Sequence, residues 1–296
     1  TNTETKSSAA SDVYKRQALL CAIAESLPPV IDDNLAISWV GGASFAVLFS
    51  IQSPIPVPVM DWKLALSINV VPAILALLFR WISPRGVLLA CLLGTVILLG
   101  LGLIAYLTIC AFLLLGSLVT RLGLKMKTEQ GLAEPNRGRR GVVNVISNGA
   151  VPCIIGLFGL WLHDSVMMIA YVAAVATAAF DTVATEIGQW LGRTTVNPAS
   201  FRRVPAGTPG AISLEGTLAG FVAAVAICAV PFLTSALPLA GVIVLLASAT
   251  AGALSESLIA SWSKPKFVYA GEVLNFYNTL VGATIAAGLW TLFRLS

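Results

Sequence analysis

The stretch that decides how this chain is built reads Asp181-Thr-Val-Ala-Thr185-Glu186-Ile-Gly188 and resumes as Arg202-Arg203-Val-Pro205-Ala-Gly207-Thr208-Pro209-Gly210-Ala-Ile-Ser213-Leu-Glu215-Gly216-Thr217. Two carboxylates end one very apolar segment, and a third opens the next. The loop between them carries positive charge and no acid. Because charge inside membrane-grade hydrophobic sequence is costly, it marks a functional site by default. We therefore expect a site at one membrane face.

The composition of the whole chain supports a membrane protein. Of its 296 residues, 57% are hydrophobic and only 11% are charged, whereas a soluble domain carries about a quarter charged residues. Several apolar runs reach the roughly 20 residues that a helix needs to cross a bilayer. The predicted fold is all-α, a polytopic helical membrane protein.

The apolar runs predict about nine transmembrane helices, to within about one. Their expected ranges are 36–51, 62–82, 87–103, 104–120, 141–162, 165–190, 212–235, 238–261 and 273–293. With nine spans and an inner N-terminus, 16 of the 18 Lys and Arg residues lie on one side, and only Lys63 and Arg294 lie on the other. This positive-inside pattern makes the N-terminus and the basic loops cytoplasmic, in a cell or thylakoid-type membrane.

The chain is expected to divide into four parts. Residues 1–35 form a tail and a short apolar segment, disordered or foreign to the mature protein in part; 36–121 are scaffold helices, 122–140 a basic loop, and 141–293 the catalytic half. Each span of the last part is polar at its inner end. The polar clusters are Asn144, Ser147 and Asn148; Asp181, Thr185 and Glu186; Ser213, Glu215 and Thr217; Ser255 and Glu256; and Asn275 and Asn278. They predict a pocket that opens to the cytoplasmic side.

Carboxylates next to hydroxyl groups predict a magnesium site. Asp181 and Thr185 are four residues apart and share a helix face. Glu186 lies about 140° further round a regular helix, so one ligand meets both acids only if the helix is broken or the pocket surrounds it. Such oxygen ligands hold Mg²⁺ together with substrate phosphates. The alternative is that the acids pair with Arg202 and Arg203 and only anchor the loop.

The loop at 202–210 has the residues of a phosphate site. Arginine suits bidentate phosphate contact, and Gly207 and Gly210 let backbone N–H groups approach an anion near the start of the next helix. Arg202 and Arg203 also fit a topology signal or a contact to lipid headgroups. Ser213 fits a helix cap, and Gly216 with Gly220 forms a GxxxG pair typical of helix packing.

Further polar residues lie at the same expected depth. Glu256, between Ser255 and Ser257, is a fourth acid, whose alternative role is a buried hydrogen bond. The pairs Asn144 with Asn148 and Asn275 with Asn278 each share a helix face. Asparagines in membranes also serve as hydrogen-bonding contacts between helices, so both roles stay open for them.

The numbers of histidines and cysteines exclude other classes of metal site and catalytic site. His163 is the only histidine, which excludes a histidine-ligated metal centre and a histidine-based triad. The five cysteines lie in or beside apolar runs with no CxxC spacing, which is typical of packing residues.

The motifs in combination resemble a known family. They are Arg140-Gly-Val-Val-Asn144-Val-Ile-Ser-Asn148-Gly149, Asp181-Thr-Val-Ala-Thr-Glu186-Ile-Gly188, Val204-Pro205-Ala-Gly207-Thr208-Pro-Gly210-Ala-Ile-Ser213-Leu-Glu215-Gly216-Thr217-Leu-Ala-Gly220 and Asn275-Phe-Tyr-Asn278-Thr-Leu. The chain resembles, over about residues 36–293, an integral-membrane family long filed as a domain of unknown function. That family includes the plant and cyanobacterial phytyl-phosphate kinases and, more distantly, the animal transmembrane protein 19.

The resemblance implies transfer of a phosphoryl group from a nucleoside triphosphate, CTP being favoured, to a prenyl monophosphate such as phytyl phosphate, a step toward tocopherol. It implies Mg²⁺ on Asp181, Glu186 and Glu256, and catalytic roles for Asp181, Glu186 and Glu215. The implied nucleotide and phosphate contacts are Asn148, Thr185, Arg202, Arg203, Gly207, Thr208, Gly210, Ser213, Thr217, Asn275 and Asn278. Many relatives have an Asp-Ser pair where this chain has Glu256-Ser257, which keeps the charge but lengthens the side chain.

Two alternatives use the same pocket differently. A cytidylyltransferase of a lipid phosphate would release pyrophosphate where a kinase releases CDP. A transporter of a prenyl phosphate or another anion would show repeat symmetry and polar groups at the membrane midplane, and the polar clusters lie near one face instead. The expected partners are the lipid bilayer and a prenyl monophosphate, with no nucleic acid.

Overall fold

The structure is a computed structural model that describes residues 60–133, 138–162, 164–234, 236–262 and 271–295. The predicted tail, the predicted span at 36–51 and His163 lie outside the described residues. Six of the described helices are long and apolar enough to cross a membrane. The prediction of a helical membrane protein is therefore confirmed, while the count of nine spans and the side of the N-terminus stay predictions.

The elements follow the predicted apolar runs closely. In order they are α3 (Trp62–Ile68), α4 (Val70–Leu78), α5 (Pro84–Val119), α6 (Leu124–Glu129), α8 (Val142–Gly159), α9 (Ser165–Leu191), β1 (Thr195–Val196), β2 (Ile212–Ser213), α10 (Leu214–Leu233), α11 (Leu239–Trp262) and α12 (Gly271–Leu295). The predicted span at 62–82 is two short helices that meet at Asn69. The Asn69 amide donates to the Ala65 carbonyl (2.8 Å) and accepts from the Tyr106 hydroxyl (3.0 Å), so it links α3 to α5.

Helix α5 reverses its direction at Gly102. This glycine has φ 83° and ψ −174°, which interrupts the helical backbone in the left-handed region. A Cβ on Gly94 would lie 2.9 Å from the Tyr106 ring, although a straight helix would separate these residues by about 18 Å. The two halves of α5 therefore lie side by side, and the break falls next to the predicted boundary between residues 103 and 104.

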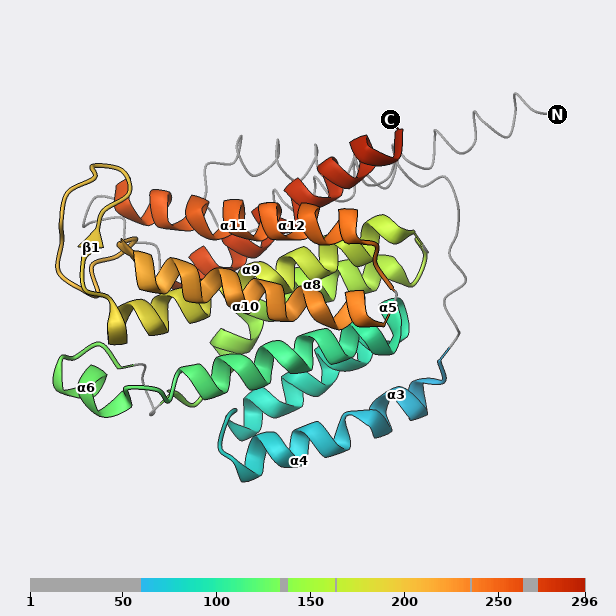
Figure 1. The fold of residues 1–296 in the computed structure, drawn as a ribbon. Helices are drawn as coiled ribbons and strands as arrows, with labels where there is room; N and C mark the ends of the chain where they lie inside the picture. The colour runs from blue at the N-terminus through green and yellow to red at the C-terminus, as the bar shows by residue number, and fades with distance from the viewer. Residues whose placement is uncertain (1–59, 134–137, 163, 235, 263–270, 296) are drawn as a thin grey trace.

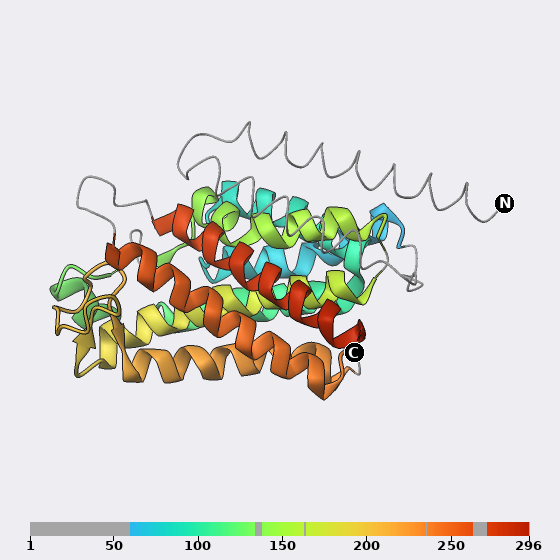
Figure 2. The ribbon, with the colours of Figure 1, turned by 90° about the horizontal axis from the view of Figure 1, so that it is seen from above.

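Helix α9 is the centre of the bundle (Figures 1 and 2) and contacts α5, α8, α10, α11 and α12. Every residue from Val166 to Phe180 is buried except Met168. Close packing is possible because small side chains line the contacts. A Cβ on Gly216 would lie 2.5 Å from the Ala184 carbonyl oxygen, and one on Gly220 would lie 2.7 Å from that of Phe180. This confirms the predicted packing role of the glycine pair, which brings α10 against α9.

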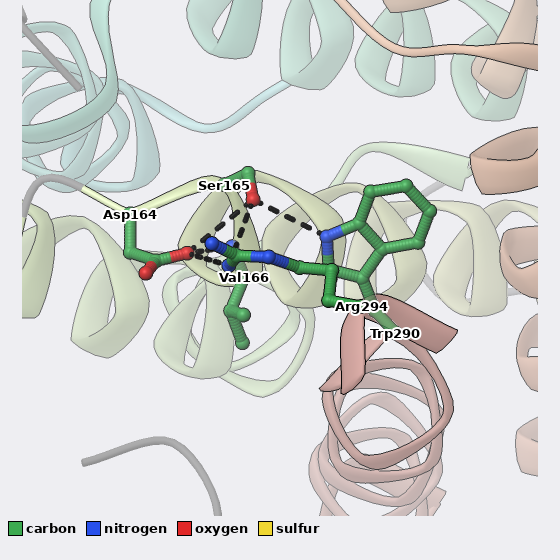
Figure 3. Close-up of polar contacts among 5 residues, drawn as sticks. All are labelled: Asp164, Ser165, Val166, Trp290 and Arg294. Atoms are coloured by element: carbon green, nitrogen blue, oxygen red, sulfur yellow. Dashed lines mark hydrogen bonds and ion pairs between the residues drawn. The ribbon is translucent and has the colours of Figure 1, made fainter. Parts of the chain in front are cut away.

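The two ends of the bundle differ in character. Helix α6 and strand β1 lie at one end, with the C-terminus at the other (Figures 1 and 2). At the C-terminal end, buried Asp164 caps α9 by accepting from the Val166 amide (2.9 Å) and also binds the Arg294 guanidinium (2.6 Å). The Trp290 indole donates to the Ser165 hydroxyl at 3.2 Å (Figure 3). These bonds hold the end of α12 against the start of α9 and leave the opposite end for the site.

Candidate functional site

A pocket of about 320 Å³ lies at the end of the bundle that carries the β-strands, and residues of α9, α10, α11 and α12 line it. All of its lining residues fall within 180–274, inside the half of the chain predicted to be catalytic. The predicted site residues that line it are Asp181, Thr185, Gly207, Thr208, Gly210, Ser213, Thr217 and Glu256. These predicted residues come from three helices and one loop and meet in one place, as the polar ends of the spans predicted.

Two acids from different helices face each other in this pocket. Asp181 comes from α9, ten residues before its end, and Glu256 comes from α11. Their carboxyl groups lie within hydrogen-bonding reach of each other. The Asn278 amide of α12 donates to the Glu256 carboxylate, and Asn278 is itself fully buried. Asn278 therefore orients an acid of the pocket without lining the pocket itself.

The loop between β1 and β2 covers the pocket with backbone. The two strands pair antiparallel, with Thr195 opposite Ser213, and this fixes both ends of the loop. Gly207 and Gly210 have φ values of 82° and 72°, a left-handed conformation that glycine adopts without strain. A Cβ on Gly210 would clash with the Ser257 carbonyl oxygen of α11, so glycine is also required by the close approach of the loop to that helix.

Ser213 places the start of α10 at the pocket. Its hydroxyl accepts from the Gly216 amide at 3.1 Å and caps the helix, as predicted. The N-terminal end of α10 carries the positive end of the helix dipole, which favours an anion beside it. Helix α10 and the loop thus bring backbone N–H groups and a positive dipole to the same wall.

Glu186 lies away from the pocket. Helix α9 is unbroken from Ser165 to Leu191, so Glu186 stays about 140° round from Asp181. Its carboxylate forms an ion pair with Lys127 of α6, and both residues are buried, with exposed fractions of 4% and 1%. The Lys127 ammonium also donates to the Thr120 carbonyl at 3.1 Å. The sequence predicted that Glu186 binds a metal ion or pairs with Arg202 and Arg203. In the structure its partner is Lys127 instead.

The two arginines also lie outside the pocket lining. Arg202 and Arg203 are exposed on the loop beyond β1. In this loop the backbone N–H of Asn197 donates to the Arg202 carbonyl at 2.9 Å. The Asn197 side chain tightens this turn by accepting from the Ala199 and Ser200 amides. Among the described residues that line the pocket there is no Lys or Arg.

The remaining predicted residues have separate places. Glu215, in the first turn of α10, and half-buried Asn275 of α12 are not among the lining residues. Asn144 and Asn148 line another cavity, of about 100 Å³, together with residues of α4 and α5. The Asn148 amide donates to the Asn144 carbonyl at 3.1 Å, a bond within α8. In this structure the asparagine pair of α8 is thus separate from the pocket.

A sequence profile described as integral membrane protein DUF92 matches residues 67–287. The chain belongs to this family. The resemblance inferred from the motifs is thereby confirmed, and so is the assignment as a multi-pass integral membrane protein.

Three relatives of this DUF92 protein show how widely the sequence is shared. An uncharacterised membrane protein of Synechocystis is 35% identical over 219 residues, 71% of this chain and 83% of the relative. The chloroplastic protein VTE6 of Arabidopsis thaliana is 33% identical over 247 residues, 80% of this chain and 73% of the relative. An uncharacterised membrane protein of Methanocaldococcus jannaschii is 30% identical over 210 residues, 70% of this chain and 84% of the relative. No solved structure matches the chain.

Of the three acids predicted to bind Mg²⁺ in this DUF92 protein, only Asp181 and Glu256 lie together in the pocket. No group of three or more His, Cys, Asp and Glu side chains in the described ranges is placed to hold a metal ion. Mg²⁺ keeps several waters and takes one or two protein carboxylates plus substrate phosphates. Asp181 and Glu256, with the hydroxyls of Thr185 and Ser257 in the same lining, fit that donor set.

Some pocket residues escaped the sequence reasoning. Ser257 and Gln189 line the pocket, and each lies within a few residues of a predicted acid, so proximity to Glu256 and Glu186 was the available signal. Leu132 packs against Gly207, where a Cβ would clash with its side chain. Leu132 follows the helix that contains Lys127, and neither residue carries a pattern that separates it from the rest of the basic loop.

Proposed function

We propose that this protein is a prenyl monophosphate kinase that transfers a phosphoryl group from a nucleoside triphosphate to a prenyl phosphate at the membrane face. CTP is the favoured donor and phytyl phosphate the favoured acceptor. The observation that carries the proposal is the meeting of Asp181 and Glu256 in a pocket whose other wall is a glycine-containing loop and the start of α10. Membership of the DUF92 family, which the motifs linked to phytyl-phosphate kinases, supports the same reaction.

The paired acids are the reason to place Mg²⁺ in this pocket. Two ionised carboxylates within hydrogen-bonding reach repel each other unless a cation or a proton lies between them. Asp181 and Glu256 would hold the ion, and Asn278 would keep the Glu256 carboxylate turned toward it. The bound ion would neutralise charge that develops on the transferred phosphoryl group.

The rest of the phosphate charge would be met by backbone. In the pocket wall from Ala206 to Ser213 the Thr208 and Ala211 amides bond within the loop, and we assign the phosphate contacts to the other N–H groups. The dipole of α10 adds positive potential at Ser213. The Thr217 hydroxyl lines the same space as a further donor. The Thr208 hydroxyl also lines it, but its proton is donated to the Pro205 carbonyl at 2.7 Å. The described lining has no cationic side chain. The metal ion and the backbone N–H groups would therefore provide most of the binding of the triphosphate.

The acceptor requires little chemistry from the protein. A prenyl phosphate is already an anion at neutral pH, so no strong general base is needed to make it a nucleophile. Phosphoryl transfer depends mainly on holding the two phosphates in line. The apolar residues Phe180, Leu254 and Leu274 are also in the pocket lining and suit contact with the first carbons of an isoprenoid tail.

The direct test is a product assay with the purified protein in detergent, Mg²⁺, labelled CTP or ATP, and phytyl or geranylgeranyl phosphate. The proposal expects a prenyl diphosphate together with CDP, or ADP if ATP serves. Release of pyrophosphate with a CDP-linked lipid would replace the kinase by a cytidylyltransferase. Absence of any diphosphate product with all donor and acceptor pairs would refute the kinase.

A further inference from the structure

A second hollow lies at the turn between α4 and α5, and none of its lining is shared with the pocket described above. Its volume is about 780 Å³. Three arginines line it, namely Arg80, Arg121 and Arg139, which come from the end of α4, the segment after α5 and the segment before α8. Residues far apart in the sequence thus bring three guanidinium groups to one place.

Two of these guanidinium groups are held in position by backbone carbonyls. The Arg121 Nη2 donates to the Phe79 carbonyl at 2.6 Å, and the Arg139 Nε donates to the Ile82 carbonyl at 3.1 Å. Both acceptors belong to the turn that joins α4 to α5. Each of these bonds uses one nitrogen of a guanidinium group, and a guanidinium group has five N–H donors in all. Because the planar groups are anchored, less entropy is lost when they bind an anion.

The third arginine sits on strained backbone. Arg80 has φ 54°, in the left-handed region that is unfavourable for a non-glycine residue. Glycine would relieve this strain, yet the chain has an arginine at this position in the lining of the hollow. The hollow also includes Ser83, which caps α5 by accepting from the Gly86 amide at 3.2 Å, so a helix N-terminus adds positive potential.

The surroundings select an anion that carries an apolar chain. No carboxylate is among the described residues that line the hollow. Phe79 and Leu124 line it beside the arginines. Leu78, at the end of α4, is 69% exposed, and the outer face of α4 continues with exposed Ile74 and Val71. An apolar helix face that ends in a basic hollow at the loop end of the bundle matches a lipid, with its chains along α4 and its headgroup at the arginines.

We propose that the hollow formed by Arg80, Arg121 and Arg139 is a binding site for the phosphate headgroup of an anionic phospholipid of the surrounding bilayer. The site is separate from the kinase pocket and does not depend on the proposed reaction. It would hold the turn between α4 and α5 at the membrane surface. Arg85 provides a matched control, because it is exposed one residue into α5 but does not line the hollow.

The test measures lipid binding to the purified full chain in detergent by native mass spectrometry, in titrations with phosphatidylglycerol and with phosphatidylcholine of the same acyl chains. We expect one phosphatidylglycerol to bind ahead of any phosphatidylcholine. The variant Arg80→Gln/Arg121→Gln/Arg139→Gln should lose about a hundredfold in affinity for it, given the contribution of each basic residue at an anionic surface. Arg85→Gln should bind as the wild type does.

A single variant keeps the test independent of folding. Arg80→Glu leaves both anchoring bonds of Arg121 and Arg139 in place and should still weaken phosphatidylglycerol binding at least fivefold. Wild-type affinity in both Arg80→Glu and the triple variant would overturn the proposal, as would an equal loss in Arg85→Gln. Inorganic phosphate serves as the third probe. If it competes with phosphatidylglycerol at an equal concentration, the acyl chains contribute nothing and the assignment to a lipid is wrong.

Discussion

Asp181 and Glu186 lie five residues apart on one unbroken helix, and the structure gives them different surroundings. Asp181 faces Glu256 in a pocket closed by loop backbone, whereas Glu186 is buried against Lys127 on another side of α9. Both residues are acids of the same helix. The partner on the facing element is what differs, an acid for Asp181 and a lysine for Glu186. An acid that is paired with a lysine contributes to the stability of the fold, whereas an acid that faces another acid can bind a cation.

The largest expected effect is on turnover at the acid pair. Asp181→Asn removes a charge that the proposed Mg²⁺ needs, so prenyl diphosphate formation should fall about a thousandfold or more. Thermal unfolding should stay close to the wild type. Glu129→Gln, which changes an exposed acid of α6, is the control and should keep full activity. Comparable turnover in Asp181→Asn would place the chemistry elsewhere.

The opposite behaviour is expected at the buried ion pair. Lys127→Met removes the ammonium group that pairs with the buried Glu186 carboxylate, which should lower the free energy of unfolding by about 3–5 kcal/mol. The double variant Lys127→Met/Glu186→Met removes both charges and should recover most of that loss. Chemical or thermal unfolding in detergent measures both. A double variant as unstable as the single one would show that the pair is not the stabilising unit.

A smaller effect is expected at the residue that supports Glu256. Asn278→Leu removes the amide donor to the Glu256 carboxylate, so that carboxylate is held less well. Loss of such a supporting contact weakens metal binding by about 10- to 100-fold. The Mg²⁺ concentration for half-maximal activity should rise accordingly, while the rate at saturating Mg²⁺ changes less. An unchanged Mg²⁺ requirement would separate Asn278 from the metal.

The smallest effect is expected at the loop arginines, where the structure departs from the sequence pattern. Arg202→Gln/Arg203→Gln changes exposed residues outside the pocket lining, so the KM for the nucleotide should shift by about threefold at most. A loss of nucleotide affinity of more than tenfold would return these arginines to the phosphate site.

Much of this molecule follows from local pattern. Apolar length places α9, α10, α11 and α12 within a few residues of their observed ends, and the spacing of Gly216 and Gly220 predicts their contact with α9. The polar inner ends of three spans predict the pocket that contains Asp181, Thr217 and Glu256. These features depend on helical periodicity, which the sequence records directly.

The remainder depends on contacts between distant segments. Lys127 precedes Glu186 by 59 residues, and no periodicity links the two. The place of Arg202 and Arg203 depends on the pairing of β1 with β2, two strands of two residues each. Asn148 lines a different cavity because α8 packs against α5 as well as α9. In each case tertiary contact decided between roles that residue type alone left open.

The central claim is that Asp181 and Glu256, and not Glu186, hold the divalent cation. Binding of Mn²⁺ in place of Mg²⁺, followed by electron paramagnetic resonance with CTP present, tests it on three proteins. The wild type and the double variant Lys127→Met/Glu186→Met should bind the ion with similar affinity, and Asp181→Asn should bind it at least tenfold more weakly. The account would be contradicted if Asp181→Asn bound Mn²⁺ as the wild type does while the double variant lost it.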